Sequence, residues 1–208
     1  MNEELLDPRV FYEKVRELTA APPKQKGSAG WTEWFARSMK QLAADGGMYC
    51  QNYLSSEFGE STEKEWMNVD HVFVDSRKGY DRFPQIVVEH ENGGFGTTLD
   101  EMETGELADP AKARASIEWA FWKCLSMRAK LSVLVAYPWG RNQDDRDFAM
   151  NVLGQIASGW VRSFSTEGLN CLVLLGWWKN GGPARPLDDL YEPFVVERAA
   201  ALRTLERR

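Results

Sequence analysis

The run from residue 84 to residue 92, Pro-Gln-Ile-Val-Val-Glu-His-Glu-Asn, constrains the fold more than any other stretch of this chain. Its apolar part, Ile86 to Val88, is typical of a buried strand, and the run then continues into the carboxylates of Glu89 and Glu91. A carboxylate at the rim of a core needs compensation, and a bound cation would supply it. The run therefore predicts a strand that presents acidic groups to a metal ion.

A second apolar stretch, residues 67–75, precedes this strand and is separated from it by turn-prone residues. We expect the two stretches to pair as an antiparallel hairpin, in a register symmetric about the turn that sets Asp70 directly opposite Glu89. Because side chains alternate between the faces of a strand, Glu91 falls on the same face. The pattern predicts that Asp70, Glu89 and Glu91 converge, with a repulsion that a metal ion or a proton would relieve.

The hairpin is otherwise apolar on both faces, which predicts a sheet with helices on both sides. A helix from Pro110 to about Ala129 leads into a buried strand at 131–137, the pattern of a parallel strand–helix–strand unit. Other periodic segments predict helices near 8–18, 29–45, 144–164 and 190–205 and a buried strand at 169–178, with 48–58 left open between helix and strand. We therefore expect an α/β fold with a central mixed sheet.

The length of 208 residues fits one domain, since a second would leave two small cores. Within a single domain spanning 1–208, we expect an N-terminal helix and linker at 1–28, a core at 29–180 and a C-terminal turn and helix at 181–208.

The composition indicates which cellular compartment and which classes of binding partner to expect. The formal net charge of −6 counts against binding that depends on neutralising phosphates, unless the local field at the site differs from the total. The three cysteines, at 50, 124 and 171, lie far apart in apolar surroundings, which indicates reduced packing residues in a cytoplasmic protein. No signal peptide or membrane-spanning stretch is expected, because the N-terminus and the rest of the chain lack a long apolar run.

The order of helix, hairpin with Asp and then Glu-x-Glu, helix, strand, helix, strand resembles the PD-(D/E)xK, or restriction-endonuclease-like, superfamily. Residues 66–70 (Trp-Met-Asn-Val-Asp), residues 88–92 (Val-Glu-His-Glu-Asn) and the helix with Trp119, Trp122 and Lys123 look like an uncharacterised branch of it. The signature strand of that branch ends in Glu-x-Glu-Asn instead of Glu-x-Lys. The likeness covers roughly residues 30–180 and implies a three-layer fold.

The resemblance implies a nuclease that hydrolyses phosphodiester bonds, in DNA more than in RNA. In the superfamily the Asp and the first acid of the signature bind a divalent metal that activates water, which gives Asp70 and Glu89 this role with Mg²⁺ or Mn²⁺. The signature lysine is replaced by Glu91. Some members supply the lysine from the following helix, which makes Lys123 the candidate here.

Several alternatives stay open at this point. Glu91 could be a third metal ligand, could support the ligands without any catalytic lysine, or could pair with an arginine across the sheet. Lys123 could extend to solvent without a catalytic role. The fold could also have lost its activity and serve as a silent binding or assembly module, in which tryptophans contact a partner; the candidates are Trp34, Trp119, Trp122, Trp177 and Trp178. A homodimer is compatible with the sequence, and no membrane partner is expected.

The histidines and the other acidic residues have weaker claims to a site. Because side chains alternate along a strand, His71 and His90 face the opposite side of the hairpin from Asp70 and Glu89. We therefore expect both histidines to be structural. Asp75 lies near the turn, where aspartate is common. A glutamate from the N-terminal helical region supports the site in some relatives, but nothing in the pattern chooses between Glu33 and Glu57.

Overall fold

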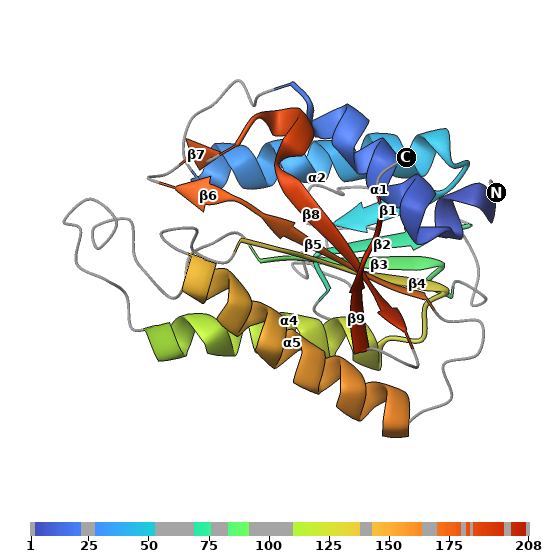
Figure 1. Ribbon diagram of the computed structural model, residues 1–208. Coiled ribbons are helices and arrows are strands. Elements are labelled where there is room, and N and C mark those ends of the chain that lie inside the picture. The colour runs from blue at the N-terminus through green and yellow to red at the C-terminus, as the bar shows by residue number, and fades with distance from the viewer. Residues whose placement is uncertain are drawn as a thin grey trace.

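The computed structural model describes residues 3–21, 28–52, 69–75, 83–91, 110–137, 143–163, 170–179, 182–183, 185–197 and 201–206. Across these ranges the chain forms a seven-stranded mixed sheet with four α-helices packed against it (Figure 1). The expected fold class, an α/β protein with a central mixed sheet flanked by helices, is confirmed.

The strand order in the sheet is β1-β2-β3-β4-β5-β8-β9. These strands are β1 (Tyr49–Asn52), β2 (His71–Val74), β3 (Ile86–Glu91), β4 (Leu131–Ala136), β5 (Asn170–Gly176), β8 (Tyr191–Glu197) and β9 (Ala201–Thr204). The three central strands, β3, β4 and β5, run parallel, and the outer pairs are antiparallel. A separate two-stranded ribbon pairs β6 (Trp178–Lys179) with β7 (Gly182–Pro183).

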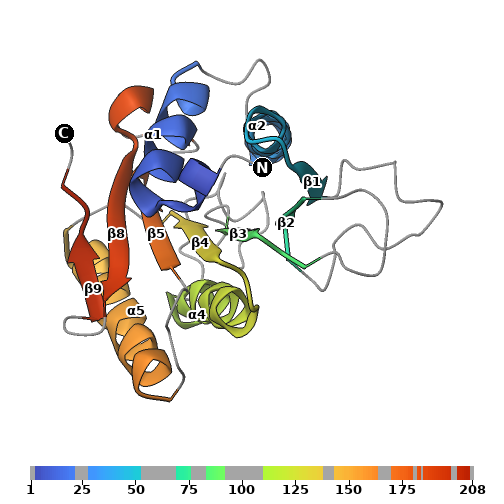
Figure 2. The same ribbon diagram turned by 90° about the vertical axis from the view of Figure 1, so that its right-hand side faces the viewer.

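The helices form a layer on each face of the sheet (Figure 2). One layer contains α1 (Pro8–Thr19) and α2 (Ser28–Asp45), and the other contains α4 (Pro110–Ser126) and α5 (Gln143–Ser163). Two short 3-10 helices, η1 (Glu3–Leu6) and η3 (Leu187–Asp189), complete the described elements. The α1 helix begins as its sequence predicts, because Asp7 Oδ1 accepts a hydrogen bond from the backbone N–H of Arg9 at 2.7 Å and Pro8 is the first helical residue.

Each layer of helices buries one face of the sheet. Phe11, Phe35 and Met39 of the α1/α2 layer pack with Phe73, Ile86, Val88 and Val133. Phe121 and Leu153 of the α4/α5 layer pack with Leu134 and Val173, and Cys124 joins Val72 and Val87 in a smaller cluster. The central strands are covered on both sides, which explains why they read as continuous apolar runs.

The hairpin of β2 and β3 has the register that the sequence predicts. His71 lies opposite Val88, and Phe73 lies opposite Ile86. Continued by one residue, this register sets Asp70 opposite Glu89. The expected turn between the strands lies outside the described residues, as do residues 22–27 of the linker and the whole of residues 92–109.

The expected C-terminal helix at 190–205 is wrong, because this segment forms β8 and β9. Pro193 has no backbone N–H and would interrupt a helix, whereas in β8 its carbonyl accepts a hydrogen bond from the N–H of Leu205 at 2.9 Å. The strand β8 also pairs with β5, whose second edge would otherwise lack a hydrogen-bonded neighbour. Of the unassigned stretch at 48–58, residues 49–52 form the edge strand β1.

Candidate active site

The hairpin carries the acidic residues to the face of the sheet that α4 covers. Val72, Val74 and Val87 pack with Cys124 and Ala129 in one apolar cluster. Side chains alternate along β3, so Glu89 and Glu91 lie on the same side as Val87. The side chain of Asp70 is half-buried immediately before β2. Asp70, Glu89 and Glu91 therefore lie on one face of the hairpin, as expected.

Asp70 is anchored by the neighbouring strand. Its Oδ2 accepts a hydrogen bond from the backbone N–H of His90 at 2.7 Å. This bond ties the start of β2 to β3 between the two glutamates, because His90 separates Glu89 from Glu91. A charge-assisted hydrogen bond of this kind from a backbone N–H helps to fix the carboxylate in place.

Glu89 and Lys123 form a buried ion pair. Lys123 Nζ lies 2.9 Å from Glu89 Oε2, and the side chain of Glu89 is 2% exposed, compared with 22% for Lys123. Lys123 is held over the sheet by its neighbour on α4, since the fully buried Cys124 donates from Sγ to the carbonyl of Val133 at 3.2 Å. The structure thus brings the candidate lysine of the following helix to the first acid of the signature strand.

Glu91 lies at the end of β3 and is half-buried. Burial raises the pKa of its carboxyl above the usual value, the negative charge of Asp70 raises that pKa further, and the charge of Lys123 lowers it. Glu91 is therefore close enough to both residues to respond to their charges. Its ionised form is disfavoured at this position, and an added cation would favour it.

The expectation that three carboxylates gather at one point is not reproduced. Within the ranges that the structure describes, no group of three or more His, Cys, Asp or Glu side chains is placed to hold a metal ion. Residues two apart on a strand are separated by roughly 6.6 Å, and Glu89 forms an ion pair with the ammonium of Lys123. Their role as metal ligands stays a prediction.

The donor chemistry of the site nevertheless fits a hard divalent cation. Asp70 and Glu91 offer carboxylate oxygens on one face, and Mg²⁺ is commonly held by only one or two protein carboxylates and several waters. Glu89 can bind a cation in addition to Lys123, because a carboxylate offers about four lone-pair positions.

Both histidines lie on the other face of the sheet, as expected. His90 stacks on Phe35 with ring centroids 4.0 Å apart, and its Nε2 lies 3.1 Å from the hydroxyl of Tyr137. His71 Nδ1 lies 3.3 Å from the side-chain nitrogen Nδ2 of Asn52. Burial lowers the pKa of His71 to about 3 and that of His90 well below its usual value. Both rings are therefore neutral core residues near neutral pH.

The remaining acidic candidates do not join the site. Glu33 lies on α2, in the opposite helical layer from Lys123, and pairs with Arg37 at 2.6 Å on the surface. Asp75 is exposed directly after β2. Glu57 lies outside the described residues.

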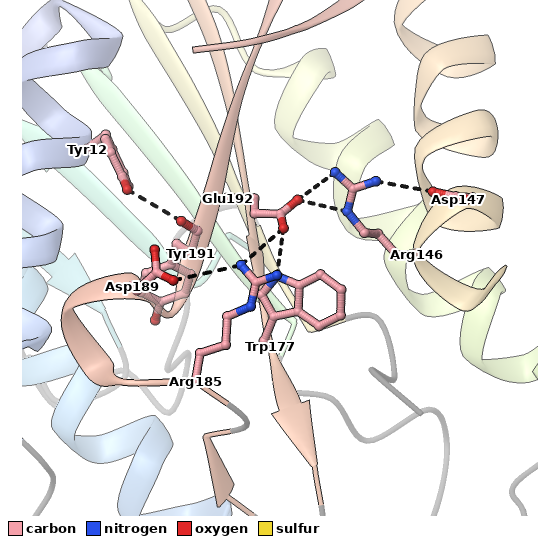
Figure 3. Close-up of polar contacts among 8 residues, drawn as sticks. All are labelled: Tyr12, Arg146, Asp147, Trp177, Arg185, Asp189, Tyr191 and Glu192. Atoms are coloured by element: carbon pink, nitrogen blue, oxygen red, sulfur yellow. Dashed lines mark hydrogen bonds and ion pairs between the residues drawn. The ribbon is translucent and has the colours of Figure 1, made fainter. Parts of the chain in front are cut away.

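The structure also contains a second charged cluster, which the sequence did not predict. Glu192 of β8 accepts hydrogen bonds from Arg146 Nε at 2.7 Å and from Trp177 Nε1 at 2.9 Å (Figure 3). Arg185 lies 3.2 Å from the same carboxylate and over the Trp177 ring at 4.2 Å from its centroid. These residues are far apart in sequence and match no motif. Sequence alone gave no signal for them, and the cluster joins α5 to the C-terminal strands.

Comparison with known proteins adds no assignment: no family model, curated protein or solved structure matches this chain. Among the described helices, none combines the length and the apolar character that crossing a membrane requires.

Proposed function

We propose that this chain is a divalent-metal-dependent nuclease that hydrolyses phosphodiester bonds in DNA, with a three-layer fold related to restriction endonucleases. The observation that carries the proposal is the contact of 2.9 Å between Lys123 Nζ and Glu89 Oε2. It places a helix-borne lysine beside the first acid of a Glu-x-Glu strand, opposite Asp70 in the hairpin register. Two acids and a lysine brought together from a hairpin and the next helix match the arrangement that the resemblance implies.

Each residue has a distinct role in the proposal. Asp70 and Glu89 would hold Mg²⁺ or Mn²⁺ with Glu91 as a third ligand, and the bound ion would lower the pKa of a water and neutralise charge on the phosphate. The backbone bond from His90 keeps the carboxylate of Asp70 at the site. Lys123, with 22% of its side chain exposed, can present its ammonium to an incoming phosphate while it stays paired with Glu89.

The proposal is tested by nicking of supercoiled plasmid DNA with Mn²⁺. The variant Glu89→Gln keeps the shape of the side chain but removes its charge, so we expect the nicking rate to fall by about a hundredfold or more. Glu33→Gln is the matched control, because Glu33 lies on the surface in the other helical layer, and it should nick at the wild-type rate. Equal nicking by wild type and Glu89→Gln, or no nicking by the wild type, would refute the proposal.

The alternative function is a catalytically silent binding module. Two observations favour it: the described residues contain no three-ligand cluster, and the side chains of Trp119 and Trp122 are exposed on α4. In that case Glu89 and Lys123 would be a structural ion pair. Metal binding then distinguishes the two functions, because a silent module has no reason to be stabilised by a divalent cation.

A further inference from the structure

Two indole rings are exposed on the outer side of α4. Trp119 is 67% exposed and Trp122 is 45% exposed, whereas Trp31 and Trp160 are buried in the core. The inner side of the same helix contributes Phe121 and other buried residues, so the two tryptophans are not needed to hold the helix on the sheet. Large apolar side chains side by side in water indicate a contact surface more often than a scattered single residue does.

Trp119 and Trp122 lie next to Lys123, the α4 residue of the candidate active site. Residues three and four apart are neighbours on a helix surface, so Trp119 lies between Trp122 on one side and Lys123 on the other. Lys123 reaches inward from this edge to Glu89, with 2.9 Å between Nζ and Oε2. A chain of nucleotides with a phosphate at Lys123 would therefore bring its neighbouring bases over the indoles.

The charge of the protein points to stacking as the source of affinity. The formal net charge of −6 counts against binding that depends mainly on the release of counterions from many phosphate contacts. Aromatic side chains stack on bases without sequence preference, but only where the faces of the bases are open. In a duplex these faces are occupied by neighbouring base pairs.

We propose that Trp119 and Trp122 form a stacking platform for unpaired bases, so that the substrate is single-stranded DNA or a duplex with an unpaired segment at the cleaved position. This inference rests on the proposed nuclease function and specifies the substrate class of the same site. The two rings are specificity-determining contacts outside the chemistry, which belongs to the acids and Lys123.

The test is fluorescence anisotropy with fluorescein-labelled oligo(dT) and a fluorescein-labelled, fully paired DNA duplex, each titrated with the full-length protein in EDTA so that no cleavage occurs. Wild type should bind oligo(dT) more tightly than the duplex. Trp119→Ala and Trp122→Ala should each raise the dissociation constant for oligo(dT) by about tenfold, whereas Trp119→Phe should retain part of the affinity. Phe83→Ala is the matched control, since Phe83 is also an exposed aromatic residue, at 68%, but does not lie on α4.

Three results would overturn the inference: unchanged oligo(dT) affinity in both alanine variants, an equal loss in Phe83→Ala, or a wild type that binds the fully paired duplex at least as tightly as oligo(dT). A change in the sedimentation of the DNA-free variants, with oligo(dT) affinity intact, would instead assign the indoles to contact between copies of the chain. Because binding is measured without cleavage, these outcomes are separate from the plasmid test. Metal-dependent nicking that Glu89→Gln removes could stand even if the tryptophans prove irrelevant.

Discussion

Gly176, at the end of β5, lies against a tyrosine ring that cannot move aside. A Cβ atom added at this position would overlap the ring of Tyr137 and come within 3.2 Å of the ring of Tyr191. The hydroxyl of Tyr137 lies 2.9 Å from Trp31 Nε1 and 2.8 Å from the hydroxyl of Tyr191, which fixes the ring in the core. The absence of a side chain at residue 176 is thus a packing requirement.

We predict that Gly176→Ala lowers the free energy of unfolding by about 1–3 kcal/mol, because the extra methyl group overfills a packed core. Gly154→Ala is the matched control: Gly154 lies in α5, and beyond its chain neighbours and the local helix backbone no atom lies within 4 Å of an added Cβ. That substitution should raise the free energy of unfolding by about 0.5–1 kcal/mol through the higher helix propensity of alanine. Urea unfolding measures both values, and equal stability of Gly176→Ala and wild type would contradict the packing described for Tyr137.

At the level of single residues, the sequence predicted the face of the sheet but not the contacts on it. A register symmetric about the turn was enough to set Asp70 opposite Glu89. Alternation along β3 was enough to send His90 to the other side, because it depends only on local strand geometry. It could not show that Lys123 forms an ion pair with Glu89. That contact depends on how α4 lies over β3, which only the packed core determines.

At the level of elements, apolar runs and periodicity identified the central strands and the helices that cover them. The exception is the C-terminal segment, where alanine, leucine, arginine and glutamate favour a helix by intrinsic propensity. Strand pairing with β5 overrides that preference, and Pro193 is the local signal against a helix. The edge strand β1 was equally hard to predict, because four residues are too few to show a period.

The C-terminal strands are joined to α5 through Glu192, and we predict that Glu192→Ala destabilises the protein. The carboxylate is partly buried and accepts bonds from Arg146 and Trp177, so its loss removes charge-assisted hydrogen bonds worth about 1.5–3 kcal/mol. Asp147→Ala is the control, because Asp147 contacts the same arginine at 3.1 Å but is 60% exposed. It should change stability little.

Hydrogen exchange followed by mass spectrometry would locate the effect of Glu192→Ala. Backbone amides of β8 and β9 should exchange faster in this variant, while those of β3 and β4 should keep their protection. Uniformly faster exchange across the sheet, or no difference between Glu192→Ala and Asp147→Ala, would show that this cluster does not hold the C-terminal strands in place.

For the molecule as a whole, the buried histidines make stability depend on pH. The pKa of His71 is lowered to about 3 by burial, and that of His90 is lowered well below 6.5 by burial and by the proximity of His71. Both groups titrate near 6.5 in the unfolded chain. The unfolded state therefore binds more protons between about pH 3 and pH 6.5, so their contribution is complete above 6.5 and is lost as pH falls.

We predict that His71→Leu flattens this dependence. Below pH 6.5 the free energy of unfolding of wild type should change with pH more steeply than that of the variant, by up to about 1.4 kcal/mol per pH unit, in the direction of lower stability at lower pH. Glu91 acts in the opposite sense, because its raised pKa makes ionisation above its usual value of 4.5 unfavourable to the folded state. Since Glu91 is present in both proteins, it cancels in the comparison. Parallel pH profiles, measured by urea unfolding, would contradict the neutral buried ring of His71.

The central claim is that the acids on the α4 face of the hairpin hold a divalent cation, and thermal melting in a Mn²⁺ titration tests it most directly. A cation that binds only the folded protein should raise Tm progressively, with about 2.7 kcal/mol of added stability at a hundredfold excess over Kd. Asp70→Asn can still accept the backbone bond from His90 but lacks the charge, so its shift should be much smaller than that of wild type. No rise in the Tm of wild type at millimolar Mn²⁺, or an equal rise in Asp70→Asn, would contradict the claim.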